Sequence, residues 1–173
     1  PAFTNYVEGI YVGYKYYETA AQEGSIDYDK TVQYPFGYGL SYTEFEQKMG
    51  ELEEKDGQIS VDVEVTNTGD VAGKDVVEVY YKPPYTNGGI EKSSANLIEF
   101  AKTDLLQPGE TQTVTVTFSI EDMASYDENN AKAYVLEKGD YVISINSDSH
   151  TVLDQKTYTA GNDVVYKLSL IHI

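Results

Sequence analysis

The chain contains no cysteine and no tryptophan, and it has only two histidines. Without cysteine it can form neither a disulfide bond nor a thiolate metal site, and this composition suits either side of a bacterial membrane. His150 falls in a predicted hairpin loop and His172 in the C-terminal tail, so we expect both to be exposed. Neither suggests a metal centre or a catalytic triad, and we expect no cofactor and no metal.

Positively charged residues are scarce, because 12 lysines and arginines stand against 29 aspartates and glutamates, for a formal net charge of −17. A field of that sign repels phosphate backbones and anionic lipids, which argues against nucleic acid and membrane surfaces as partners. The sequence also has no long apolar run and no signal-peptide pattern. The compartment is left open between the cytoplasm and the outside of a bacterial cell.

Tyrosine, by contrast, is abundant, with 17 copies, and hydrophobic residues make up 40% of the chain, which is enough for a core. Tyrosine suits half-buried strands and interfaces, where one end of the side chain is apolar and the other is wet. It also suits platforms that stack against sugars. Because many of the tyrosines alternate with polar residues, we favour the structural role.

Alternation of apolar and polar residues is the strongest structural signal. Ile59, Val61, Val63 and Val65 alternate with polar residues, which predicts a strand with one buried and one solvated face. Turn-forming residues separate this run from similar runs along the chain. We expect strands at residues 42–52, 59–66, 74–82, 96–103, 114–118, 141–145 and 151–159, and a single helical turn at 121–127.

These seven short strands predict an all-β fold, namely a seven-stranded antiparallel β-sandwich of the immunoglobulin or fibronectin type III-like kind. The lack of a cysteine pair and of tryptophan favours the fibronectin type III-like variant. Apolar residues occur on both faces of the strand at 74–82, so we expect it to lie in the interior of its sheet.

The two ends of the chain lack this alternation. Residues 1–38 are aromatic and irregular, with a loop-like stretch at 20–30, so we expect them to bury against a neighbouring domain. Without that neighbour they would wrap their own sandwich, pair in a dimer or be disordered. We place the sandwich at residues 39–160 and a C-terminal extension at 161–173, whose last residues, 167–173, are either an edge strand or a tail added during cloning.

Few residues suggest chemistry. The long loop Pro83–Glu91 is the best candidate for contact with a ligand, because it combines two glycines with the exposed-looking side chains of Tyr85, Asn87 and Glu91. An ordinary variable loop is the alternative.

Carboxylates are numerous, and a pair of them can hydrolyse a glycoside, but nothing distinguishes two of the 29. A calcium site at Asp27 and Asp29 is a further alternative, although the alternation of a calcium loop is incomplete there.

Several spaced motifs resemble glycoside hydrolase family 3, which includes β-glucosidases and β-xylosidases. Residues 8–17 and 34–45 resemble the junction between the α/β sandwich domain of that family and its fibronectin type III-like domain. Residues 63–80 resemble the second and third strands of the latter domain, and 139–141 resemble its end. Residues 157–166 are similar to a bacterial branch of the family in which the domain order is permuted.

The resemblance implies that this chain is an accessory part of a β-glycosidase, and that residues 1–38 come from the end of the α/β sandwich domain. The family's catalytic aspartate and glutamate lie in other domains, and neither motif is present here, so we expect no catalytic residue and no enzymatic activity from this chain alone. The expected partners are the catalytic domains of the same parent chain, and a β-linked oligosaccharide at Pro83–Glu91. Alternatives are a carbohydrate-binding module that uses exposed tyrosines, or a surface adhesion domain.

Overall fold

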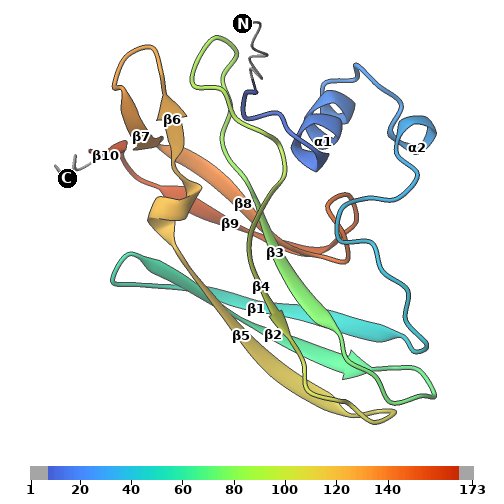
Figure 1. Cartoon of the computed structure of the whole chain (residues 1–173). Helices are drawn as coiled ribbons and strands as arrows, with labels where there is room; N and C mark the ends of the chain where they lie inside the picture. Colours follow the sequence, from blue (N-terminus) through green and yellow to red (C-terminus); the bar gives the residue numbers. More distant parts are fainter. Residues whose placement is uncertain (1–7, 168–173) are drawn as a thin grey trace, which may run out of the picture.

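A computed structural model describes residues 8–167 of the chain (Figure 1). Two short helices come first, and strands make up most of the rest. The elements are α1 (Tyr14–Gln22), α2 (Tyr28–Thr31), β1 (Phe45–Lys55), β2 (Gln58–Asn67), β3 (Val76–Lys82), β4 (Asn96–Lys102), β5 (Thr111–Ser119), a 3-10 helix (Ile120–Met123), β6 (Ser125–Asp127), β7 (Ala133–Leu136), β8 (Gly139–Asn146), β9 (Val152–Ala160) and β10 (Val164–Tyr166).

Two antiparallel sheets form the sandwich. One has the strand order β1-β2-β5 and the other β4-β3-β8-β9, so β3 is an interior strand, as its sequence predicts. The all-β sandwich is therefore confirmed, and each of the seven expected strands is present.

The expected number of strands is wrong. The structure has ten, because β6, β7 and β10 form a third, small sheet in the order β10-β7-β6. These three strands span only three or four residues each, too few for an alternating pattern to stand out. Strand β6 also occupies part of the helical turn expected at 121–127, and the helix is confined to Ile120–Met123. The tail expected at 167–173 lies, beyond Lys167, outside the described residues.

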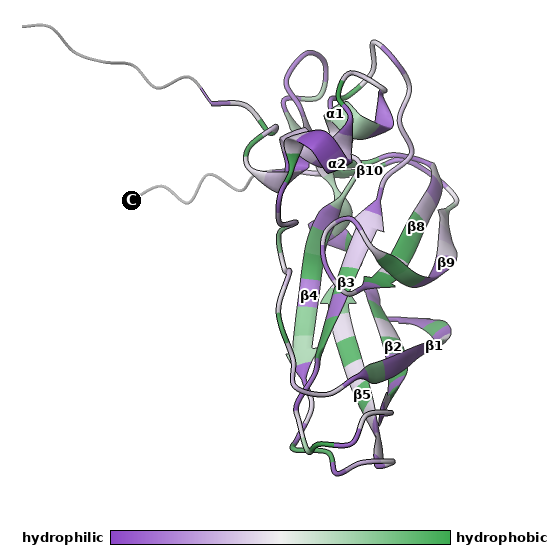
Figure 2. Cartoon of the chain, turned by 90° about the vertical axis from the view of Figure 1, so that its right-hand side faces the viewer, coloured by the Kyte–Doolittle hydropathy of each residue, from purple (hydrophilic) through white to green (hydrophobic). Residues whose placement is uncertain are grey.

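The core lies between the two larger sheets. The side chains of Val63 and Val65 on β2 and of Ile143 and Ile145 on β8 have no measurable exposure to solvent. Because side chains alternate across a strand, their neighbours point to the outer faces. Figure 2 shows this alternation as green and purple bands along the strands. Burial of these aliphatic side chains is the main source of stability of the sandwich.

The N-terminal segment, residues 8–44, lies over its own sandwich, which is one of the three arrangements expected in the absence of a neighbour. Both helices contact the β8–β9 loop, and the chain then runs along the sandwich to reach β1 (Figure 1). The irregular structure expected within residues 1–38 is wrong at Tyr14–Gln22, because α1 is a helix of nine residues. Its single buried residue is Glu18, and a charged residue at the centre of the inward face hides the amphipathic pattern.

Candidate functional site

The loop between β3 and β4 stands at one end of the sandwich, next to α1. Its three predicted site residues differ in their surroundings. The side chain of Tyr85 lines a pocket and is 45% exposed. Glu91 is exposed but hydrogen-bonded, and Asn87 is exposed in the turn at the tip, where Gly89 N–H donates to the carbonyl of Thr86.

A buried lysine fixes the base of this loop. Lys92 is 6% exposed, and its Nζ donates to the carbonyl oxygen of Pro84 at 2.6 Å and pairs with the carboxylate of Glu137. The loop also rests on Gly139, where a Cβ atom would lie 3.0 Å from the ring of Pro84. A buried charge needs hydrogen-bond or ionic partners. Through these partners the Lys92 ammonium group joins the two ends of the loop to the β7–β8 turn.

Tyr11 contacts the loop from the N-terminal segment. Its hydroxyl donates to Glu91 Oε2 at 2.6 Å and to the carbonyl oxygen of Lys92 at 3.3 Å. Burial and the hydrogen bond to the Glu91 carboxylate raise the pKa of Tyr11 above its usual range, so the phenol stays neutral and remains a donor. The loop predicted to face a ligand is therefore held in part by its own chain.

A pocket of about 300 Å³, which we call the loop pocket, opens between α1 and the β3–β4 loop. Tyr11, Tyr16, Tyr85 and Pro83 give it apolar faces, and Glu23 and Lys92 add charge. Aromatic walls with a few polar groups are typical of small-molecule sites. The arrangement suits the stacking of a flat apolar surface, such as one face of a sugar ring.

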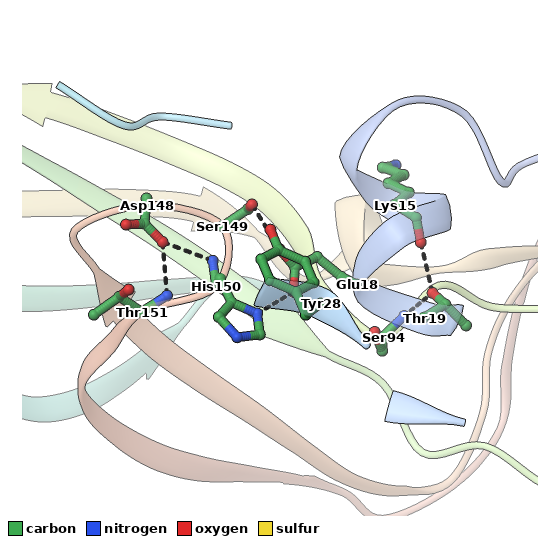
Figure 3. A network of polar contacts seen from close by, with 9 residues as sticks. All are labelled: Lys15, Glu18, Thr19, Tyr28, Ser94, Asp148, Ser149, His150 and Thr151. Carbon is green, nitrogen blue, oxygen red and sulfur yellow. Dashed lines mark hydrogen bonds and ion pairs between the residues drawn. The ribbon is translucent and has the colours of Figure 1, made fainter. Parts of the chain in front are cut away.

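A second group of contacts fixes the helices to the β8–β9 loop (Figure 3). Glu18 Oε1 accepts hydrogen bonds from the hydroxyls of Tyr28 at 2.6 Å and Ser149 at 2.8 Å, and Oε2 lies 2.8 Å from Nδ1 of His150. The rings of Tyr28 and His150 stack at 3.7 Å between centroids. Asp148 shapes the loop by accepting from the backbone N–H groups of His150 and Thr151.

Helix α1 also protects the edge of a sheet. The backbone N–H of Leu97 on the edge strand β4 donates to the hydroxyl of Tyr14. Just before β4, the backbone N–H of Ser94 donates to Oγ1 of Thr19, as Figure 3 shows. Exposed edge groups are a risk for unwanted pairing, so these side chains have a structural role. The aromatic ring of Tyr14 stacks on Phe36 at 4.6 Å and meets Tyr80 edge to face at 6.2 Å.

The structure brings Tyr85 and Glu91 to Tyr11, whereas Asn87 does not line the loop pocket. Sequence reasoning missed Tyr11, Glu18 and Lys92. Tyr11 and Glu91 are 80 positions apart, so no local pattern could have joined them. Only its position in the sequence, directly after the loop Pro83–Glu91, could have suggested a role for Lys92.

Other predicted groups stay apart. His150 is exposed as expected, although its ring is engaged by Glu18 and Tyr28. Asp27 pairs with Lys30, and among residues 8–167 no cluster of three or more acidic, histidine or cysteine side chains is arranged to hold a metal ion. In the same range, no helix combines the length and apolar character needed to cross a membrane.

The family model of the fibronectin type III-like domain matches residues 75–149. The chain contains a fibronectin type III-like domain. The match begins just before β3 and ends in the β8–β9 loop, so it includes the β3–β4 loop with Tyr85 and Glu91. The fibronectin type III-like resemblance expected from the sequence is thereby confirmed.

Similarity extends beyond this domain into the N-terminal segment. The chain is 38% identical to β-glucosidase A of Butyrivibrio fibrisolvens, over 94% of this chain and 21% of that protein. It superposes on β-glucosidase 3B of Thermotoga neapolitana with a TM-score of 0.78 and 35% identity, over 92% of this chain and 20% of the other. It also superposes on the family 3 β-glucosidase of Bifidobacterium adolescentis with a TM-score of 0.76 and 27% identity, over 95% and 23%.

The fibronectin type III-like domain and its N-terminal segment therefore span about a fifth of the length of the relatives that they match. These relatives are β-glucosidases, as the motifs predict. They come from fungi as well as bacteria, so the similarity does not single out the bacterial branch.

Proposed function

We propose that this chain is a non-catalytic accessory region of a family 3 β-glycosidase, which packs on the catalytic domains of its parent chain and stabilises their arrangement. The carrying observation is that nearly the whole chain matches only about a fifth of each relative. About four fifths of each relative lies outside the region that this sandwich matches, and we infer that the catalytic residues lie there.

The surface of the N-terminal segment supports a packing role. Every second residue from 34 to 42 has a large apolar or aromatic side chain, and all five are exposed, Leu40 to 91% and Tyr42 to 98%. We call this set the junction stripe (Tyr34, Phe36, Tyr38, Leu40 and Tyr42). Contiguous exposed apolar side chains mark contact surfaces, and we infer that the neighbouring catalytic domain covers the stripe.

Three carboxylates near the pockets are engaged in structural contacts, which supports the absence of catalysis. A glycosidase needs two carboxyl groups on either side of an open sugar site. Glu18 is the buried glutamate of the helical segment, and it already accepts hydrogen bonds from two hydroxyls and contacts His150. Glu91 accepts from Tyr11, and Asp148 accepts two backbone N–H groups. Each is used to hold structure.

Incubation of the purified chain with a chromogenic β-glucoside tests this half of the proposal. We expect no release of the chromophore above the buffer rate. Turnover that persists through purification and is lost on substitution of a single carboxylate would overturn it.

A second role, contact with a β-linked oligosaccharide at the β3–β4 loop, is supported by the loop pocket. Tyr11, Tyr16 and Tyr85 line it together. Titration calorimetry with cello-oligosaccharides should then give saturable heat that Tyr85→Ala removes and Tyr126→Ala, a change at an exposed tyrosine outside this pocket, leaves intact. The absence of heat would remove this role and leave the accessory role standing.

A further inference from the structure

A different hollow lies on the outer face of the sheet β4-β3-β8-β9, on the other flank of α1. It has a volume of about 470 Å³ and we call it the outer-face pocket. The helices and the β8–β9 loop form its rim, while β3, β8 and β9 form its floor. The side chains that matter for the argument are Glu18, Tyr28, Tyr80, Ser144, Asn146 and Gln155.

The floor contains an acceptor without a donor. Ile143 and Ile145 point into the core, so Ser144 and Asn146, which alternate with them on β8, point to the outer face. Asn146 is only 2% exposed, and its Oδ1 has no hydrogen-bond partner among the described residues. Buried polar atoms are nearly always satisfied, because an unpaired one is destabilising. An orphaned acceptor that lines a pocket indicates that a donor enters from outside.

Hydrogen bonds within the chain already position the rim when no ligand is present. Glu18 is fixed by the hydroxyls of Tyr28 and Ser149 and by the ring of His150, as Figure 3 shows. Burial and the bond to Glu18 raise the pKa of Tyr28, so this hydroxyl remains a donor to the carboxylate. A site whose walls are already ordered loses less entropy on binding.

The chemistry of the lining selects the class of ligand. Asn146, Ser144 and Gln155 offer neutral polar groups, while Tyr28 and Tyr80 are mostly buried in the wall. Gln155 lies directly opposite Ser144 in the register of β8 and β9, so both are on the same face. The net charge of −17 disfavours anions, and the Glu18 carboxylate already has its partners. The ligand that best matches this lining is a neutral molecule that carries several hydroxyl groups.

We propose that the outer-face pocket binds a neutral polyhydroxylated molecule of about monosaccharide size, with one of its hydroxyls donating to Asn146 Oδ1. Its volume falls in the range of about 300–1,000 Å³ that is usual for small-molecule sites. This site adjoins the loop pocket, with which it shares Gln22, Lys82 and Ser94 at the boundary, and it requires neither the accessory role nor the oligosaccharide role described above.

The test is a titration of the ¹⁵N-labelled 173-residue chain with D-glucose, followed by NMR, with cyclohexanol as a ring of similar size that has one hydroxyl. We expect saturable shifts of amide signals in β8, the β8–β9 loop and α1 with glucose, and none with cyclohexanol. No saturable shift with glucose, equal shifts with both molecules, or shifts confined to the loop pocket would overturn the proposal.

Two variants sharpen the test. Asn146→Leu keeps a similar side-chain volume and removes the orphaned acceptor, so the unliganded chain should melt at a higher temperature and bind glucose about tenfold more weakly or worse. Gln155→Ala, at an exposed position, should weaken binding without altering the fold. Asn87→Leu is the matched control at an exposed site and should bind as the parent does. Unchanged affinity in both pocket variants would contradict the assignment.

Discussion

The sandwich and the N-terminal segment, residues 8–44, are held by different physics. In the sandwich, Val63, Val79 and Ile143 are completely buried among other apolar side chains. In the segment, the buried residue of α1 is Glu18, which is held by hydroxyl groups and an imidazole, while Leu40 and Tyr42 of the junction stripe face solvent. One region carries its own core, and the other adheres through a small number of directed polar contacts and a few aromatic contacts.

This difference predicts which part of the chain unfolds cooperatively. Apolar burial is non-directional and is shared by many residues, so the sandwich should unfold as a whole. The segment depends on a few hydrogen bonds, so it should open locally without unfolding the sandwich. Substitutions in the two regions should therefore differ in how much of the chain they destabilise, as well as in the free energy that they cost.

The largest effect is expected for Ile143→Ala at the centre of β8. The side chain has no exposure, and truncation to alanine in a core costs about 2–5 kcal/mol because it leaves a cavity. Urea unfolding should show this loss in free energy with a single transition. Val152→Ala, at a half-exposed position on β9, is the control and should change stability by less than about 0.5 kcal/mol. Equal losses in the two variants would mean that the sandwich core is not where the structure places it.

A smaller and local effect is expected for Glu18→Ala. It leaves the hydroxyls of Tyr28 and Ser149 without their acceptor, at a cost of about 1–3 kcal/mol. Hydrogen exchange should become faster in α1 and the β8–β9 loop, while protection in β2 and β8 is unchanged. Glu23→Ala, on the exposed side of the helix end, should have no such effect. A uniform rise in exchange across the chain would contradict separate units.

Glu78→Gln should give a pH-dependent effect on the outer face. Burial raises the pKa of Glu78, while the hydroxyl of Tyr80 donates to its carboxylate at 2.9 Å and opposes the shift. The folded state therefore holds the proton more tightly than the unfolded state, and stability falls as pH rises from the unfolded pKa through the folded one.

Glutamine avoids that loss, so the variant should be more stable than the parent at pH 7, by less than about 1 kcal/mol because Glu78 is only half-buried. The advantage should vanish below the unfolded pKa of glutamate. Thermal melts at several pH values measure it, with the exposed Glu53→Gln as the control. A variant less stable than the parent at pH 7 would show that the charge is favourable there.

A similarly small effect, confined to one loop, is expected for Tyr11→Phe, which removes one hydroxyl from the contact with the β3–β4 loop. The loss should be about 0.5–1.5 kcal/mol, the net value of one hydrogen bond, and confined to that loop. Faster hydrogen exchange at residues 85–92 would report it. Tyr42→Phe, at a side chain that is 98% exposed, should leave exchange unaltered. A loop that exchanges at the same rate in both variants would remove Tyr11 from its support.

The sequence predicts one of these regions far better than the other. Alternation in Ile59–Val65 predicts a strand of a sandwich because burial of one face leaves a period of two in the sequence. Helix α1 escapes the same reasoning because Glu18 occupies its inward face. At the site, composition predicts the loop with Tyr85 and Glu91, but its contact with Tyr11 follows from the fold alone. The empty acceptor of Asn146 has no signal in sequence, because only the packing of the helices encloses it.

We propose above that the junction stripe packs against a catalytic domain of the parent protein. The most direct measurement exchanges the matching fifth of Thermotoga neapolitana β-glucosidase 3B for this chain and compares thermal melts and turnover with and without the double change Leu40→Asp and Tyr42→Asp. We expect that the exchanged enzyme folds and turns over, and that the double change lowers its melting temperature while leaving that of the isolated chain unaltered. Equal melting temperatures of the two exchanged enzymes would contradict it.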